Sequence, residues 1–327
     1  MNPLRLVFLG SDAIALPLLD WLAGEGSSLA QVAAVFTQPD RPAGRGQKVA
    51  PNAIKRWALA RGLPVHQPET LTAETRAALA ACAADVALVM AYGRILDDAF
   101  IATPRLGTLN LHTSLLPQYR GASPIQTAIA CGERETGVTL MRIIRSLDAG
   151  PLADRERVAI GADTTAADLE AALAAACVPL LARTLPLLGR GVLAFTPQAA
   201  DAASYCRRLE KGDGALDFAR PATELAARIN GLFPWPACAV TLDGQEVKVG
   251  LADARPGAGA PGEVLGAEAD GLLVGTGSGV LRLRRLQRPG GRLLAAAEFL
   301  RGFAVPAGTR IASRPMTPLV AATPFRR

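Results

Sequence analysis

Residues 85–91 read DVALVMA, an apolar run that begins with a single aspartate. A run of this kind, without polar alternation, is typical of a central parallel strand covered by helices on both faces. Other short apolar runs lie along the first half of the chain, and helical patterns separate most of them. The expected strands are 4–9, 31–37, 63–65, 108–112 and 137–144, and the expected helices are 13–23, 52–61, 73–83 and 125–131. This alternation predicts an α/β fold with a Rossmann-like, doubly wound and mostly parallel sheet.

The second half of the chain has a different pattern. A long alanine-leucine helix is expected over 166–187, and residues 189–203 then lose periodicity. One helix at 222–230 is followed by short strands broken by Asp-Gly and Gly-rich turns, at 239–242, 246–252, 262–265, 271–274 and 280–286. That spacing predicts a small, OB-like C-terminal β-barrel domain. We therefore expect one domain over residues 1–188, a linker over 189–206 and the barrel over 207–327.

The composition is that of a globular protein: 50% of the 327 residues are hydrophobic and 20% are charged. No uninterrupted apolar run reaches the ~20 residues of a membrane span, and no signal peptide is recognisable at the N-terminus. The five cysteines are widely spaced and there are only two histidines, so we expect reduced thiols and no metal site. These features predict a cytoplasmic protein that binds no membrane. We expect a monomer without an obligate protein partner.

The net charge of +6 is unevenly distributed. Through Cys206 the chain has 18 lysines and arginines and 18 acidic residues, whereas from Arg207 onward it has 17 and 11. All the excess positive charge therefore lies in the C-terminal third, which indicates a polyanionic partner for that part. An arginine-rich composition without any such partner would produce the same excess.

Three polar residues stand where two of the expected strands end. Asn110 and His112 are two residues apart on one strand, so their side chains share a face. Asp148 follows the next strand. An amide donor for an oxyanion, an imidazole and a carboxylate base suit acyl transfer to an amine. The alternative is structural. A histidine in a strand is often a hydrogen-bonded core residue, and Asn110 could equally terminate a turn.

The segment that holds these residues is long and distinctive. It reads NLHTSLLPQYR at 110–120, GASPIQ at 121–126, TGVTLM at 136–141 and LD at 147–148. Further motifs are TQPDRPAGRGQK at 37–48, DVALVMAYG at 85–93, YCRRLEK at 205–211 and FPWP at 233–236. Together they closely resemble the 10-formyltetrahydrofolate-dependent formyltransferases over almost the whole chain. The glycine after the first strand is isolated, so the dinucleotide-binding fingerprint is absent.

The resemblance implies a reaction and a set of roles. The formyl donor would be 10-formyltetrahydrofolate, used as a co-substrate without a metal. Asn110 would stabilise the oxyanion, His112 would assist as a donor paired to the acid, and Asp148 would order a water and act as base. The folate would be lined by Ser114, Leu115, Leu116 and Pro117, and the pterin would be held by backbone near Ala91, Tyr92 and Gly93.

The 37–48 loop resembles that of family members whose acceptor is charged initiator transfer RNA. Arg45 resembles the arginine that enters the acceptor-stem groove, and Arg41 and Lys48 add positive charge to the same loop. The prolines and glycines of residues 38–48 predict neither helix nor strand. On the last expected barrel strand, Arg282 and Arg284 would share one face and contact phosphates. They could equally be the charges of a solvated edge strand.

Two alternatives remain at this point. Members of the same family act on nucleotide-linked amino sugars or on glycinamide ribonucleotide, and the 37–48 loop and the basic C-terminal region argue against those acceptors. A non-catalytic RNA-binding protein could keep a relic of the enzyme domain, and the intact triplet argues against that. The chain also departs from the family's usual Leu-Asp-Thr-Gly-Asp, because Ala149 and Pro151 replace the threonine and the second aspartate.

Overall fold

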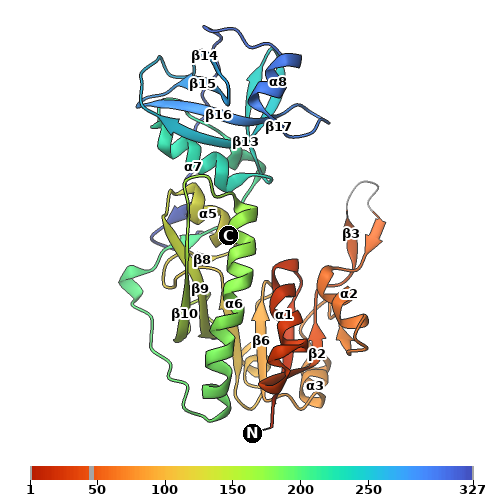
Figure 1. Cartoon of the computed structure of the whole chain (residues 1–327). Coiled ribbons are helices and arrows are strands. Elements are labelled where there is room, and N and C mark those ends of the chain that lie inside the picture. The colour runs from red at the N-terminus through yellow and green to blue at the C-terminus, as the bar shows by residue number, and fades with distance from the viewer. Residues whose placement is uncertain (1, 44–47, 326–327) are drawn as a thin grey trace. The chain divides into compact units, whose positions relative to one another are not determined.

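The computed structural model describes residues 2–43 and 48–325 (Figure 1). The chain forms two compact units, and neither is continuous in sequence. The first comprises Met1–Arg120, Gly137–Val158 and Glu170–Ala203, and the second comprises Gly121–Thr136, Ala159–Leu169 and Ser204–Arg327. Two short segments from the first half of the chain therefore group with the C-terminal part.

The first unit is built on a seven-stranded sheet in the order β10-β9-β7-β6-β1-β2-β5. Its strands are β1 (Leu4–Gly10), β2 (Ala30–Phe36), β5 (Val65–His66), β6 (Val86–Met90), β7 (Thr108–His112), β9 (Glu135–Arg142) and β10 (Leu152–Ala159). Its helices are α1 (Leu16–Ala23), α2 (Ala53–Leu59), α3 (Ala73–Ala81), α4 (Asp98–Ile101) and most of α6 (Ala166–Gly189), with short 3-10 turns at Ala13–Ala15, Glu25–Ser28 and Ala200–Ala202.

The strand order places a topological switch point beside β1. The pairs β1–β2, β1–β6, β2–β5 and β6–β7 are parallel, and β7–β9 is antiparallel. From β1 the chain first builds outward through β2 and β5, and it then returns to the other side of β1 as β6. In open α/β sheets, ligands bind at the carboxyl ends of the strands where the order reverses. The ends of β1 and β6 are therefore the first place to look for a site.

Helix α6 covers the sheet and is unusually apolar. By length and composition it could cross a membrane, but half of its most apolar stretch is buried inside the structure, as in the core helix of a globular protein. Leu173, Cys177 and Leu180 are completely buried. The Cys177 sulfur lies 4.0 Å from the sulfur of Met90 at the end of β6. The helix thus packs directly behind the strand that leads to the switch point.

The second unit is mostly antiparallel β structure. The path β12-β13-β16-β15-β14 has β17 paired to β16, and a separate three-stranded sheet has the order β18-β11-β8. The strands are β8 (Arg120–Gly121), β11 (Tyr205–Cys206), β12 (Cys238–Leu242), β13 (Gln245–Arg255), β14 (Val264–Glu268), β15 (Gly271–Gly275), β16 (Val280–Gln287), β17 (Leu294–Ala295) and β18 (Val320–Ala321). The helices are α5 (Pro124–Ala130), α7 (Ala222–Leu232) and α8 (Ala296–Gly302), with a 3-10 turn at Lys211–Gly214.

Helix α7 holds an irregular stretch of β13. The register of β13 on β16 shifts on both sides of Leu251. The buried side-chain amide of Asn230 donates to the carbonyl oxygen of Ala252 at 2.9 Å and accepts from its N–H at 2.9 Å. A buried backbone group without a partner costs free energy, so Asn230 completes the pairing that the bulge interrupts.

The architecture confirms the predicted fold class, an α/β unit with a mostly parallel sheet followed by a smaller antiparallel β domain. Among the described strands the pairing path of the C-terminal domain does not close, because β12 and β14 stand at its two ends. Strand β10 was not predicted, because its sequence LADRERVA carries four charged residues. Its partly exposed alternation explains both the charges and its place at the edge of the sheet.

Candidate active site

The carboxyl ends of β1, β2 and β6 are tied together by hydrogen bonds. The Ser11 N–H donates to the carbonyl oxygen of Ala91 at 3.1 Å, and the Ser11 hydroxyl accepts from the Gln38 N–H at 3.0 Å. The Gln38 side-chain amide donates to the carbonyl oxygen of Tyr92 at 3.0 Å. Gly10 permits this closeness, because a Cβ there would lie 2.6 Å from the carbonyl oxygen of Met90. The three strand ends form a fixed rim at the switch point.

The 91–93 loop presents backbone rather than side chains to this rim. Ala91 and Gly93 are exposed, with positive φ angles of 49° and 74°, whereas the Tyr92 side chain is buried in the apolar core. Burial raises the pKa of the Tyr92 hydroxyl. Exposed peptide groups in an irregular loop can bond the edge of a planar heterocycle. Of the three residues predicted to hold a pterin, Ala91 and Gly93 are exposed, whereas the carbonyl oxygens of Ala91 and Tyr92 are already bonded to Ser11 and Gln38.

The residues predicted to line the folate divide into two pairs. Ser114 and Leu116 are completely buried: the Ser114 hydroxyl donates to the carbonyl oxygen of Gln118 at 2.6 Å, and Leu116 packs in an apolar cluster with Met141 and Leu152. Leu115 and Pro117 are only partly buried. The side chains of Leu115 and Pro117 can therefore contact a ligand. The side chains of Ser114 and Leu116 instead pack inside the protein and fix the shape of the segment.

The structure brings His112 and Asp148 together. The His112 ring is 6% exposed, and its Nδ1 lies 3.8 Å from Oδ2 of Asp148. Its Nε2 lies 2.9 Å from the carbonyl oxygen of Tyr119. A carbonyl can only accept, so this contact assigns the proton to Nε2 and leaves Nδ1 facing the carboxylate. The imidazole is thereby held in one orientation beside the acid.

Asn110 precedes this pair on the same face of β7. It lies opposite Val89 of β6 and Met141 of β9, and it is partly exposed. Among the described residues, its side-chain amide has no hydrogen-bond partner. An amide left without a partner beside an imidazole and a carboxylate can donate to a substrate oxygen.

The position of Asp148 differs from the simple expectation. The sequence suggests a carboxylate beyond the end of another strand, facing Asn110 and His112, but β9 runs antiparallel to β7. Asp148 instead belongs to the 143–151 loop and has a positive φ of 46°, which is uncommon for a residue other than glycine. The loop, rather than a strand end, brings the acid to His112.

The 37–50 segment forms a hairpin, which corrects the prediction of no regular structure. Strands β3 (Arg41–Ala43) and β4 (Lys48–Ala50) pair antiparallel, with Pro42 opposite Val49. Proline is tolerated there because each strand of a two-stranded ribbon has an open edge. Arg41 and Lys48 are exposed on these strands. Arg45 lies outside the described residues.

The base of the hairpin is anchored by polar contacts. Lys55 on α2 forms an ion pair with Asp40 at 2.7 Å, and the Gln67 amide donates to the other Asp40 oxygen at 2.8 Å. These hydrogen bonds, from Lys55 and then from Gln67, lower the pKa of the Asp40 carboxyl. Asn52 and Gln67 also donate to the carbonyl oxygen of Gln38. The cationic ribbon thus starts from a defined point on the sheet.

The placement of Arg282 argues against its predicted role as a phosphate contact. It is 5% exposed, and its guanidinium bonds Asp253 at 2.9 and 2.6 Å and Asp270 at 2.6 Å. Arg284 is partly exposed and pairs with Asp163 at 2.8 Å. The first half of β16 is buried at every position, so alternation there does not bring a side chain to the solvent. Arg285, one residue further, is exposed.

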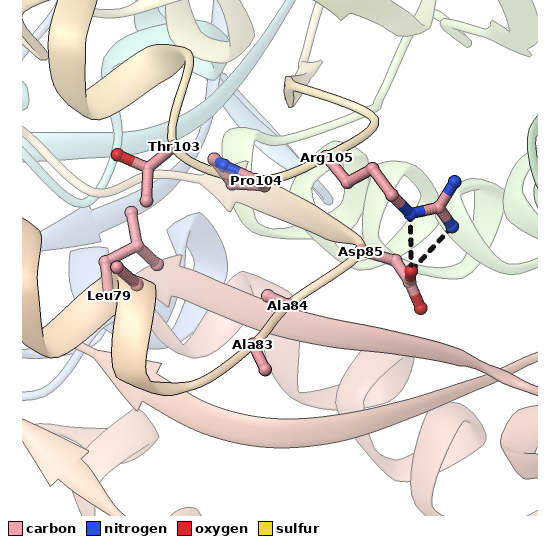
Figure 2. Close-up of a pocket in the computed structure, with 8 residues that line it drawn as sticks. Leu79, Ala83, Ala84, Asp85, Thr103, Pro104 and Arg105 are labelled. Carbon is pink, nitrogen blue, oxygen red and sulfur yellow. Dashed lines mark hydrogen bonds and ion pairs between the residues drawn. The ribbon is translucent and has the colours of Figure 1, made fainter.

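Outside these sites, a surface cavity of about 310 Å³ lies at the amino-terminal edge of β6 (Figure 2). Figure 2 shows Arg105 bonded to Asp85, which also accepts from the Arg5 N–H at 2.8 Å. The Arg5 hydrogen bond, opposed by burial and aided by Arg105, lowers the pKa of Asp85. The Asp85 carboxylate already has hydrogen-bond partners in Arg5 and Arg105, so we assign no ligand to this cavity. Within residues 2–43 and 48–325, no group of three His, Cys, Asp or Glu residues is placed to hold a metal.

Comparison with known proteins identifies the family of this chain. The chain matches the formyl transferase family over residues 4–185 and the C-terminal domain of formyl transferases over residues 208–304. It is 44% identical over 310 residues to the methionyl-tRNA formyltransferase of Aromatoleum aromaticum, covering 94% of this chain and 97% of that protein. The chain belongs to the methionyl-tRNA formyltransferase family. The Burkholderia multivorans member is 42% identical over 323 residues, covering 95% and 98% of the two chains. The protein is therefore a formyl-transferring enzyme.

Solved structures share the fold at low sequence identity. A sugar 3N-formyl transferase, WlaRD, solved in the presence of dTDP and 5-N-formyl-THF, has a TM-score of 0.62 at 16% identity and covers 86% of this chain and 98% of that one. HypX from Aquifex aeolicus, in complex with tetrahydrofolic acid, has a TM-score of 0.62 at 18% identity and covers 91% and 47% of the two chains. The fold is thus shared with a formyl transferase that is named for a sugar.

Three residues around the site have no signal in strand or helix periodicity, although Tyr119 and Arg120 end the NLHTSLLPQYR motif. The Tyr119 carbonyl holds His112, and Arg120 is buried beside it. Gln198, from the segment without periodicity, contacts the loop that carries Asp148. Contacts of this kind join distant segments, so neither strand nor helix periodicity could predict them.

Proposed function

We propose that this enzyme transfers the formyl group of 10-formyltetrahydrofolate to the α-amino group of methionine carried by initiator transfer RNA. The names of relatives at 42–45% identity support this acceptor. The folate bound by fold neighbours supports the donor. The observation that carries the proposal is the constellation of Asn110, His112 and Asp148 beside the switch point of the sheet.

In the proposed reaction the methionyl amine attacks the formyl carbon directly. Asp148 accepts the proton that the amine loses, through an ordered water. As the carbon becomes tetrahedral, its oxygen becomes an oxyanion that the Asn110 amide stabilises by donating a hydrogen bond. Collapse of this intermediate breaks the bond to N10 of the folate, which leaves as tetrahydrofolate after gaining a proton. No covalent bond to the enzyme forms.

The orientation of His112 defines its contribution. Because Nε2 donates to Tyr119, Nδ1 can donate to the oxyanion or to Asp148 only when the ring carries both protons. The Asp148 carboxylate, 3.8 Å away, balances the charge of that imidazolium. In this role His112 assists as a donor paired to the acid.

For the folate, we propose that its planar ring lies against the exposed residues Ala91 and Gly93. Leu115 and Pro117 then provide partly exposed apolar surface for the rest of the molecule. The proposed folate site thus uses both predicted segments, 91–93 and 114–117. Within the second segment, only the side chains of Leu115 and Pro117 contact the folate.

For the RNA, we propose two positively charged surfaces. One is formed by strands β3 and β4, with the exposed Arg41 and Lys48, and Arg45 is the third cation in the sequence of this segment. The other is a basic patch on the C-terminal domain, which we define as Lys248, Arg285, Arg288 and Arg292, all exposed. Lys248 lies opposite Gln287, two residues from Arg285 on the same strand, so both cations face outward together. Phosphate contacts of this kind are sequence-independent and salt-dependent.

Replacement of the base tests the mechanism. Asp148→Asn should lower turnover at saturating substrates by roughly a hundredfold or more, with folate affinity nearly unchanged, because general-base catalysis contributes that much. Asp98→Asn is the matched control, since Asp98 is exposed and pairs only at 3.8 Å with Arg145. Radiolabelled formyl transfer measures both. Near-normal turnover of Asp148→Asn would exclude the assignment.

A further inference from the structure

The loop that carries Asp148 is closed at its base, where the Arg142 N–H donates to the carbonyl oxygen of Pro151 at 3.0 Å. Asp148 has a left-handed backbone conformation, Ala149 has no polar side chain, and Pro151 has no N–H. One turn hydrogen bond, from the Ala149 N–H to the carbonyl oxygen of Ser146, is long at 3.3 Å. Gly150 packs so closely that a Cβ would lie 1.9 Å from the carbonyl oxygen of Arg142. A conformation this constrained persists only when its surroundings hold it.

Gln198 holds the loop from outside. Its side-chain amide donates to the carbonyl oxygen of Asp148 at 2.8 Å and to that of Gly150 at 2.7 Å. Its Oε1 accepts from Nε of Arg120 at 3.1 Å and from Nη2 at 2.7 Å. An amide has two donors and two acceptor positions, so all four are used. A flipped amide would place oxygen against two carbonyls, and the orientation of Gln198 is therefore unique.

Arg120 connects this contact to the histidine. It is 5% exposed, so its guanidinium is held within the protein rather than in water. The preceding residue, Tyr119, contributes the carbonyl oxygen that accepts from His112. The two residues of the 3.8 Å pair are thus tied to adjacent positions of the chain, one through the Tyr119 backbone and the other through Arg120 and Gln198.

The chain after α6 returns to the sheet to deliver Gln198. Leu152, at the start of β10, and Thr196 exchange both backbone hydrogen bonds, each at 2.8 Å. This bridge fixes residue 196 beside the end of the 143–151 loop and places residue 198 beneath it. The segment predicted to be a linker has a defined structural role at this point.

We propose that Gln198 is a positioning residue that sets the distance and direction of the Asp148 carboxylate relative to His112 and the substrate amine. The inference rests on the proposed role of Asp148 as base. Within the acid's loop Gln198 contacts only backbone carbonyl oxygens, so its effect on the reaction passes through Asp148. Small displacements of a catalytic group lower the rate strongly, by about a hundredfold for ~1 Å.

Gln198→Glu tests this with minimal change in shape. The carboxylate keeps both acceptor contacts with Arg120, but it loses both donors and faces the two carbonyl oxygens with negative charge. Turnover should fall by at least about tenfold, while the Michaelis constants for folate and charged RNA change by no more than about twofold. Thr196→Val is the matched control, because the Thr196 side chain is exposed and its backbone bridge survives the change. It should behave like the wild type.

A double-mutant cycle separates positioning from general damage. If Gln198 acts through the base, Gln198→Glu should cause no further loss when added to Asp148→Asn. An equal loss in both backgrounds, or normal turnover of Gln198→Glu beside a slow Asp148→Asn, would overturn the positioning role alone. A fully active Asp148→Asn would overturn the base assignment and, with it, this inference.

Discussion

Arg282 and Arg285 lie three residues apart on β16, and the structure assigns them opposite roles. Arg282→Met removes a guanidinium that is 5% exposed, and it leaves the Asp253 carboxylate, whose side chain is 20% exposed, without its main partner. Removing one member of a buried ion pair costs about 3–5 kcal/mol. Arg284 remains 3.6 Å from Asp253, and both carboxylates reach some water, so we expect about 2–3 kcal/mol here.

Arg285→Met removes an exposed charge from the same strand and should change the free energy of unfolding by less than about 0.5 kcal/mol. Its effect should instead appear in RNA binding. The slope of log affinity for initiator transfer RNA against log salt concentration should decrease by about 1, the contribution of one phosphate contact. Arg282→Met should leave that slope unchanged.

Urea unfolding and filter binding at several salt concentrations measure the two quantities on both variants. We expect Arg282→Met to lower the free energy of unfolding without changing the salt slope. We expect Arg285→Met to lower the salt slope with little change in the free energy of unfolding. A stable Arg282→Met with a reduced salt slope would refute the assignment of Arg282 to the interior, and it would restore the prediction made from strand alternation.

Two further predictions concern other parts of the chain. Asn230→Ala should lower the free energy of unfolding of the C-terminal domain by about 2–4 kcal/mol, since both backbone groups of Ala252 lose their partner; urea unfolding with a change below 1 kcal/mol would contradict this. Arg45→Ala should raise the Michaelis constant for charged initiator transfer RNA, or lower turnover with it, and leave folate binding unaltered. Equal kinetics of Arg45→Ala and wild type with initiator and elongator transfer RNA would reduce the hairpin to a connector.

The strands that build the site were predictable because their burial is regular. Val86–Met90 is buried at every position, as its unbroken apolar run indicates, and the alternation around Asn110 and His112 places both on one face of β7. The family motifs pointed to the same residues. Local pattern and long-range contacts agree in this part of the chain.

Features that depend on contacts between distant segments could not be predicted. The direction of β9, the loop that returns Asp148 to His112, and the Gln198 contact leave no periodic signal. The unit boundaries are of the same kind, because residues 121–136 group with the C-terminal part and α5 packs on α7. A truncation at residue 206 would remove that packing, so point variants test the domain roles more cleanly.

Strand alternation failed at Arg282 for a related reason. Alternation predicts which residues share a face, but it does not predict whether that face is open to solvent. The acidic partners Asp253 and Asp270 lie 29 and 12 residues away in sequence. Arg282 forms ion pairs with these two carboxylates inside the protein, and its own strand gives no sign of them.

The most direct test of the central claim is formyl transfer with defined acceptors. The purified chain would be given radiolabelled 10-formyltetrahydrofolate and, in parallel, methionyl initiator transfer RNA, methionyl elongator transfer RNA or a nucleotide-linked amino sugar. The account predicts that label appears on the methionine of the initiator RNA, with much slower transfer to the elongator RNA and none to the amino sugar. Transfer to the amino sugar at a rate equal to or above that of the initiator RNA would contradict it.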